Sequence, residues 1–264
     1  MGGRMNWRAP PVFLFCFIIE KEFPEIMMYD TLDARLSCAA DFVRDGAVLA
    51  DVGTDHAYLP IALLSRGAIS YAYAADVAKG PLATAQAHLD ACSAELPDLK
   101  ARIRLVLTDG LAGLEAVEPR VTDISICGMG GELIARILSD TDFVRNPDIR
   151  LILQPMTMQP VLRRWLADNG FCVEHERLCT ANGKLYSVIC CHYTGETTVL
   201  RQPLLGDTLL SEPDNADLLP LYLRTNIERL SRVVEGRTSA GVDCSDERAA
   251  LETADRLLKG MCND

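Results

Sequence analysis

The segment ADVGTDHAYLP, residues 50–60, is the most informative part of this sequence. It follows the apolar residues 47–49 and precedes the helix-forming run IALLSR at residues 61–66. The glycine allows the backbone to turn tightly and to approach a ligand without a side chain in the way. The helix beyond it presents free N–H groups and a partial positive charge. The segment therefore predicts a strand, a ligand-binding turn and a helix, as in α/β folds.

Two common nucleotide motifs are missing at this turn. The sequence has neither G-x-G-x-x-G nor G-x-x-x-x-G-K-[ST] here, and the acidic residues disfavour a pyrophosphate. A helix N-terminus suits instead the carboxylate of the methionine part of S-adenosylmethionine, which methyltransferases bind at such a turn. The alternative is a plain strand end with a capping aspartate and a turn glycine.

A second acidic strand end strengthens the cofactor interpretation. Asp76 ends the apolar run that begins at Tyr71, and it lies 23 residues beyond Gly53. An acid at about this distance holds ribose hydroxyls in α/β nucleotide folds. The next helix is predicted over residues 82–92, and the proline just before it is a helix-start signal.

The third strand, residues 103–107, also ends in an acid. Asp109 is placed to accept a hydrogen bond from an adenine amino group. The alternative role for Asp109 is an N-terminal cap for the stretch 111–117.

Further strands complete an alternating pattern. Residues 123–127 lead into three glycines within 128–131, which imply a close approach to the backbone. A strand at 150–153 and a helix follow, and Asn182-Gly183 separates the last two strands as a hairpin. The pattern predicts a Rossmann-like parallel sheet with an antiparallel C-terminal hairpin.

Seven strings carry a resemblance to a known family: ADVGTDHAYLPIALL, AADVAKGPLATA, LTDGL, ICGMGGELIARIL, RLILQPM, LRRWLADNGF and GKLYSVI. In this order, from Ala50 to Ile189, they resemble the bacterial tRNA (adenine-22-N1)-methyltransferase family. The resemblance implies a class I methyltransferase domain, S-adenosylmethionine as cofactor and tRNA as partner. It also implies a C-terminal helical hairpin.

The resemblance assigns roles to individual residues. The cofactor-binding set is Asp51, Gly53, Asp55, His56, Leu59, Pro60, Asp76, Gly80, Pro81, Asp109, Gly110, Gly128 and Gly130. Residues up to Pro60 would line the methionine side, Asp76 the ribose and Asp109 the adenine. One departure is Asp76 itself, since the family more often has glutamate at this position.

The catalytic set comprises Asp55, His56, Met129 and Gln154. Asp55 is the first choice to reach the target base. His56 is a candidate base, although a histidine at a helix start is more often a hydrogen-bonded structural residue. Enzymes that methylate exocyclic amines use an Asn/Asp-Pro-Pro-aromatic loop, and residues 128–131 replace it here. Attack by a ring nitrogen, which requires mainly positioning of an unstacked base, fits that difference.

The expected reaction is methyl transfer from S-adenosylmethionine to N1 of an adenine in tRNA. Two alternatives stay open: a small-molecule methyltransferase on the same scaffold, and a non-catalytic RNA-binding module. The complete cofactor set of Gly53, Asp76 and Asp109 disfavours the second. Transfer to a low-molecular-weight acceptor without tRNA retention would identify the first.

Composition predicts a cytoplasmic enzyme without a metal. With 264 residues, 49% of them apolar, the chain can form one sizeable core and a smaller element. Its ten cysteines are scattered without a C-x-x-C, and its four histidines make no zinc spacing with them. We interpret them as reduced thiols. Cys127, next to the glycine loop, is a minor candidate for a catalytic thiol and more often a plain core residue.

The N-terminal residues 1–28 are predicted to be a non-native or disordered extension. The apolar run Val12–Ile19 has eight residues, whereas a membrane span needs about 20. It lacks a small-residue cleavage site. We expect no membrane partner, and we expect the methyltransferase domain to cover residues 29–197.

Residues 198–264 are predicted to form a linker and a helical hairpin. The polar segment Thr208–Pro220 is the expected linker. Two apolar stripes with coiled-coil spacing follow, formed by Leu223, Ile227, Leu230 and Val234 and then by Leu251, Ala254, Leu258 and Met261. The hairpin is either an arm that grips tRNA or an element packed on the sheet for stability.

The net charge of −11 is unusual for a protein that binds tRNA, because phosphate contacts usually supply much of the affinity. Arg35, Arg163 and Arg164 are the candidate RNA-binding residues. The alternative is that these are solvated helix charges, and the acidity favours a small-molecule acceptor. The oligomeric state is left open.

Overall fold

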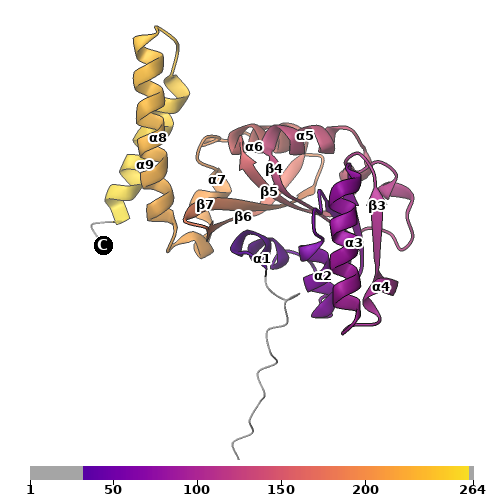
Figure 1. Ribbon diagram of the computed structural model, residues 1–264. Helices are drawn as coiled ribbons and strands as arrows, with labels where there is room; N and C mark the ends of the chain where they lie inside the picture. Colours follow the sequence, from indigo (N-terminus) through magenta and orange to yellow (C-terminus); the bar gives the residue numbers. More distant parts are fainter. Residues whose placement is uncertain (1–31, 262–264) are drawn as a thin grey trace, which may run out of the picture.

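The computed structural model describes residues 32–261, and the predicted extension 1–28 lies outside them. One seven-stranded sheet with the order β3-β2-β1-β4-β5-β7-β6 forms the centre of the molecule (Figure 1). The strands are β1 (Ala47–Val52), β2 (Ile69–Asp76), β3 (Ile103–Leu107), β4 (Asp123–Gly130), β5 (Arg150–Thr157), β6 (Phe171–Ala181) and β7 (Lys184–Tyr193).

The first five strands are parallel, and β6 and β7 pair antiparallel at one edge. This confirms the predicted Rossmann-like sheet with its antiparallel hairpin. The order reverses between β1 and β4, so the carboxyl ends of these two strands form the switch point where such sheets bind ligands. Asn182 and Gly183 have φ angles of 51° and 70°, as a tight two-residue hairpin turn requires.

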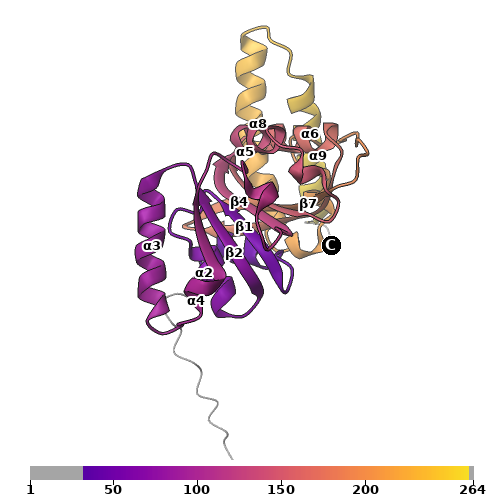
Figure 2. The same ribbon diagram turned by 90° about the vertical axis from the view of Figure 1, so that its right-hand side faces the viewer.

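Helices cover both faces of the sheet. On one face, α1 (Ala34–Ala40), α2 (Tyr58–Ser65), α3 (Lys79–Ser93) and α4 (Leu99–Arg102) enclose one part of the core. On the other, α5 (Gly131–Ser139) and α6 (Gln159–Asp168) enclose the second part. Figure 1 shows α5 and α6 on the side of the sheet opposite α1 and α2, and in Figure 2 α5 and α6 again lie away from α2 and α3. Between β3 and β4, the stretch predicted as helical holds only the short 3-10 turn η1 (Leu114–Ala116), and η2 (Phe143–Arg145) precedes β5.

The prediction of a linker over Thr208–Pro220 is wrong. This segment overlaps α7 (Asp207–Ser211), contains η3 (Pro213–Asn215) and packs on β6. Asn215 is buried because its amide donates to the carbonyl oxygens of Glu176 and Leu209 and accepts from the N–H of Leu178. These hydrogen bonds give the polar atoms of the Asn215 side chain partners inside the fold. Packing therefore crosses the predicted boundary between residues 197 and 198.

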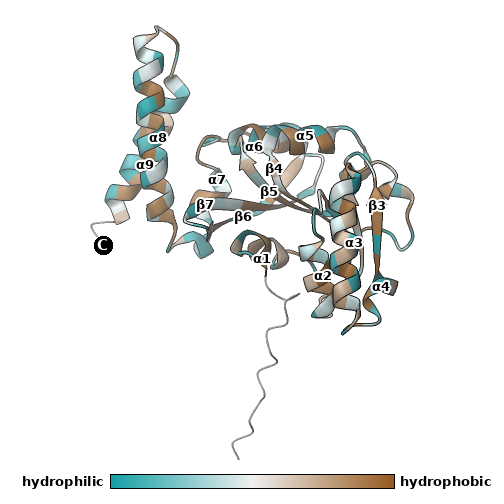
Figure 3. Ribbon diagram, viewed as in Figure 1, coloured by the Kyte–Doolittle hydropathy of each residue, from teal (hydrophilic) through white to brown (hydrophobic). Residues whose placement is uncertain are grey.

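The C-terminal hairpin consists of α8 (Leu219–Ser239) and α9 (Ser245–Met261), and it projects from the sheet (Figure 1). Most of both predicted stripes lies inside it: Leu223, Leu230 and Ala254 are buried, and Ile227, Leu251 and Leu258 pack against them. Met261, the last residue of the second stripe, is exposed, so its place in the stripe is wrong. The hydropathy colouring in Figure 3 is brown along most of the sheet and mixed along the hairpin. At its base, the hairpin core joins Leu178 of β6 and Leu205, so the base of the hairpin is anchored beside β6 while the rest projects.

Candidate active site

The turn after β1 is strained in a way typical of ligand sites. Gly53 has a φ of 75°, and Asp55 and Ala57 also have positive φ angles, of 49° and 56°. Two non-glycine residues in this region cost free energy and persist only where the surroundings hold them. A Cβ on Gly53 would overlap the methyl group of Met129. The turn therefore brings the ends of β1 and β4 into close contact, at the switch point of the sheet.

Asp51 braces this turn from inside. Its carboxylate is buried and accepts hydrogen bonds from the hydroxyls of Thr54 at 2.7 Å and Ser125 at 2.6 Å. Burial raises the pKa of Asp51, and the two hydroxyl donors oppose that effect. The Asp51 side chain is thus bonded to the turn and to β4 inside the protein, and the place of Asp51 on the methionine side stays a prediction.

Leu59 and Pro60 lie in the first turn of α2. Both side chains are buried, and Leu59 belongs to the apolar core under α2. Contact with the cofactor would therefore come from their backbone, and their place on the methionine side stays a prediction.

The carboxyl ends of β2 and β3 lie side by side and place the Asp76 carboxylate next to apolar side chains. Asp76 pairs in register with Leu107, and its Oδ1 accepts from the Ala78 N–H at 2.8 Å. Val77 and Leu107 are 67% and 52% exposed. Two large apolar side chains left open beside a carboxylate suit a ligand with a ribose and a flat ring. Neither Val77 nor Leu107 was predicted from the sequence as a site residue, although each stands at a strand end.

The remaining adenosine-side predictions lie at the same edge. Asp109 is exposed directly beyond β3, and Gly110 has a φ of 58°. Gly80 and Pro81 lie in the first turn of α3, and a Cβ on Gly80 would meet open space. The fold thus brings these residues to the same edge of the sheet as Asp76, and their ligand contacts stay predictions.

The glycine loop at the end of β4 is held by Gln154. The Gly128 N–H donates to Gln154 Oε1 at 3.0 Å, and Gln154 Nε2 donates to the Pro155 carbonyl at 3.3 Å. Gln154 is 0% exposed, so the prediction that it acts directly in catalysis is wrong. It positions the loop, whereas Gly128, Met129 and Gly130 are at least partly accessible.

Asp55 and His56 lie on the rim of the site. Their side chains are 3.4 Å apart between Oδ2 and Nε2. The His56 ring stacks on Tyr58 with centroids 5.1 Å apart, and its carbonyl contacts Nδ1 of His88 at 2.8 Å. Both residues are accessible, so either can meet a ligand, and their catalytic roles stay predictions.

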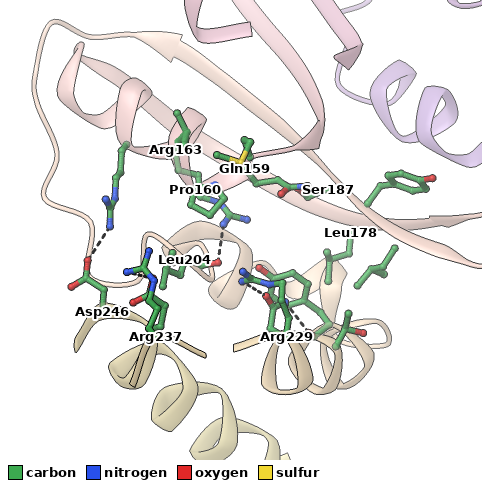
Figure 4. A pocket seen from close by; sticks show the side chains of 18 of the residues that line it. Gln159, Pro160, Arg163, Leu178, Ser187, Leu204, Arg229, Arg237 and Asp246 are labelled. Atoms are coloured by element: carbon green, nitrogen blue, oxygen red, sulfur yellow. Dashed lines mark hydrogen bonds and ion pairs between the residues drawn. The ribbon is translucent and has the colours of Figure 1, made fainter. Parts of the chain in front are cut away.

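A cleft of about 680 Å³ lies beyond the end of β5. We call it the α6–hairpin cleft; it is lined by residues of α6, β6, β7, α8 and α9 together with Leu204. Figure 4 shows Gln159, Pro160 and Arg163 of α6 on one side, with Arg229, Arg237 and Asp246 of the hairpin opposite. Met158, just before α6, lies at the end nearest the glycine loop: a Cβ on Gly131 would overlap its carbonyl oxygen.

Arg163 is a structural residue, and the prediction that it binds RNA is wrong. It is 4% exposed and forms a bidentate pair with Glu176, with an Nη2–Oε1 distance of 2.6 Å. Burial lowers the pKa of Arg163, but the Glu176 carboxylate more than offsets this and keeps the pKa above its usual range. The pair therefore joins α6 to β6 beneath the cleft.

The other two arginine candidates are accessible at opposite ends of the cleft. Arg164 is 51% exposed and pairs with Asp246 of α9 at 3.2 Å. Arg35 pairs with Asp33, and its guanidinium lies 5.4 Å from the ring centroid of Tyr186, which lines the cleft. The lining residues Arg229, Arg237 and Tyr186 had no sequence signal, because the fold alone brings them together.

Three observations concern residues 32–261 only. No helix there is long and apolar enough to cross a membrane, and no group of three or more potential ligating side chains is arranged to hold a metal. The eight cysteines in this range are free. Burial raises the pKa of Cys127 far above its usual range, so this thiol is poorly suited to act as a thiolate nucleophile.

Comparison with known proteins agrees with this geometry. A family model described as a methyltransferase domain matches residues 32–189. The tRNA (adenine(22)-N(1))-methyltransferase of Bacillus subtilis is 29% identical over 233 residues, which cover 86% of this chain and 94% of that protein.

Solved structures show the same architecture. A Streptococcus pneumoniae protein, a candidate tRNA (m1A22) methyltransferase in complex with S-adenosyl-L-methionine, is 33% identical with a TM-score of 0.70; the match covers 85% of this chain and 98% of that one. The B. subtilis m1A22 tRNA methyltransferase TrmK is 27% identical with a TM-score of 0.66, over 87% and 97% of the two chains. The chain therefore belongs to the methyltransferase-domain family, within the group of bacterial tRNA (adenine-22-N1)-methyltransferases.

Proposed function

We propose that this protein transfers a methyl group from S-adenosylmethionine to N1 of an adenine in tRNA. The observation that carries the donor half is the pair of exposed apolar side chains, Val77 and Leu107, on either side of the Asp76 carboxylate. The acceptor half is supported by the relatives, whose names specify this tRNA base. The donor would be held by the first four strand ends, within the predicted domain 29–197.

The residues present fit this donor. Asp76 would accept hydrogen bonds from the two ribose hydroxyls, and Val77 and Leu107 would cover the faces of the adenine. Asp109 is placed to accept from the adenine amino group. The turn at Gly53 and the start of α2 offer backbone N–H groups, which favour the methionine carboxylate.

The donor supplies an electrophilic methyl group on a positively charged sulfur. The lone pair at adenine N1 forms the new N–C bond while the C–S bond breaks and its electron pair goes to sulfur. Because N1 carries no proton, the protein residues need only hold the base in line. Met129 and the glycine loop, fixed from behind by Gln154, would present a flat, tight surface to that base. Asp55 is an accessible polar residue within the turn, and it would reach towards the base.

The direct test is incubation of the purified protein with labelled S-adenosylmethionine and unmodified tRNA, followed by nucleoside analysis. We expect label in 1-methyladenosine. A tRNA with the single target adenine replaced by guanine should receive no label. Transfer of label only to a low-molecular-weight acceptor would replace this proposal with the small-molecule alternative.

A further inference from the structure

The α6–hairpin cleft starts where the proposed methyl-transfer site ends. Met158 lines the cleft, and its carbonyl oxygen occupies the space next to Gly131, directly after the glycine loop. Met156 and Met158 are large apolar residues that remain exposed at this junction. A chain lying in the cleft could therefore place one base over the junction and towards the glycine loop.

Exposed arginines stand on two facing walls of this cleft. Arg164 stands on α6, and Arg229 and Arg237 stand on α8 across from it. All three side chains are exposed. Three acidic residues, Asp243, Asp246 and Glu247, line the same cleft, so the exposed arginines match the acids in number here, whereas the whole chain has a net charge of −11. Guanidinium groups bind phosphate oxygens in bidentate geometry, so these arginines can take phosphates once their acidic partners are displaced.

Acidic side chains cover two of these arginines. Asp246 reaches from α9 to Arg164 at 3.2 Å, and Glu247 contacts Arg237 at 3.3 Å. Arg229 donates to the Asn226 side chain at 2.9 Å, and no carboxylate among residues 32–261 pairs with it. The Arg164–Asp246 pair joins the two walls across the opening. Because both of its side chains are more than half exposed, water screens the pair and it contributes little to stability, so a phosphate can replace the Asp246 carboxylate.

The opposite end of the cleft has a different chemistry. The Tyr186 ring lines it, with the Arg35 guanidinium 5.4 Å from the ring centroid. Arg35 Nη1 also lies 3.4 Å from the sulfur of Met156. Unpaired RNA bases stack on aromatic rings and guanidinium planes. The cleft thus has cations along the hairpin side and a stacking surface towards the strand ends.

From these contacts we propose that the α6–hairpin cleft binds the tRNA backbone next to the target adenine, through Arg164, Arg229 and Arg237. In the free protein, Asp246 closes the opening by pairing with Arg164, and an RNA phosphate displaces it. This inference rests on the proposed function, and it makes Asp246 a residue that weakens tRNA binding. A protein partner or a small anion would be the other possible occupants.

The test measures affinity of the full chain for unmodified tRNA at several salt concentrations. Replacement of both Arg164 and Arg229 by alanine should weaken binding at least tenfold and lower the salt slope by about one unit for each phosphate that the variant no longer neutralises. The Asp246→Asn variant should bind several times more tightly. Two matched controls lie on the same helices outside the cleft lining: Arg232→Ala on α8 and Asp255→Asn on α9. Both should stay within twofold of wild type.

Specific outcomes would overturn this assignment. If Arg232→Ala weakens tRNA binding as much as the cleft double variant, the hairpin binds RNA through its general charge. If Asp246→Asn is no tighter than Asp255→Asn, the closing role of Asp246 is wrong. Unchanged tRNA affinity in the double variant would leave the cleft to another occupant. Formation of 1-methyladenosine by the wild type is measured in a separate assay. If only the proposed function is wrong, that assay fails while the differences in tRNA affinity remain.

Discussion

The proposed S-adenosylmethionine site, here called the donor side, and the α6–hairpin cleft are formed by different kinds of structural element. On the donor side, backbone turns and short segments supply almost everything, since Gly53, Asp76 and Asp109 each stand within a few residues of a strand end. In the cleft, long side chains from α6, β7, α8 and α9 converge from distant parts of the chain. The first region depends on local backbone geometry, whereas the second depends on the docking of a hairpin onto a sheet. Their vulnerabilities to substitution should therefore differ.

The largest expected difference separates two neighbouring arginines of α6. Arg163→Ala should lower the free energy of unfolding by about 3–5 kcal/mol, because it leaves the Glu176 carboxylate buried without its partner. Arg164→Ala breaks an exposed pair and should cost about 0–1 kcal/mol of stability. Chemical denaturation of both variants measures this contrast. Equal losses would mean that the buried pair contributes no more to stability than the exposed one.

The donor side should respond in ligand affinity and not in stability. Asp76→Ala removes a charged acceptor at the end of β2 and should weaken S-adenosylmethionine binding by roughly 10- to 150-fold, equivalent to about 1.5–3 kcal/mol. Asp90→Ala on α3, which removes an exposed carboxylate paired with Lys100, is the control and should bind normally. Calorimetric titration gives both values. An unchanged affinity in the Asp76 variant would remove this residue from the ribose site.

The smallest expected effect concerns Asp51, the buried carboxylate that supports the turn after β1, and the pH dependence of stability. Burial raises the pKa of Asp51 above its ordinary value near 3.8, so the folded state holds this proton more tightly than the unfolded state. Stability from this group is present below the ordinary pKa and is lost as pH rises through the raised one. Asp51→Asn should therefore flatten the decline in unfolding free energy on the neutral side of pH 3.8. Parallel pH profiles for the two proteins would contradict the assignment.

The same contrast explains what could be predicted from sequence. The positions of Gly53 and Asp76 at neighbouring strand ends could be predicted because a strand, a turn and a helix adjoin in the chain, and the parallel sheet aligns those ends. Arg163 was misassigned because its burial depends on Glu176 and on the backbone around Leu204, neither of which is close to it in sequence. The segment around Asn215 reads as a polar linker, yet three hydrogen bonds bury its side chain. Polar side chains whose hydrogen-bond partners are distant in the sequence leave no local sequence pattern that predicts their burial.

Because α8 is long, a small change of its angle at the base would move its far end by several ångströms. Its 21 residues rise about 1.5 Å each, so the helix is about 30 Å long. A tilt of about 10° at the base would move the far end by about 5 Å over that length. The Tyr222 hydroxyl, which donates to the Leu205 carbonyl at 2.7 Å, and the Arg163–Glu176 pair beside Gly206 lie at the pivot. A small angular change at these few buried contacts would therefore be magnified at the far end of the hairpin.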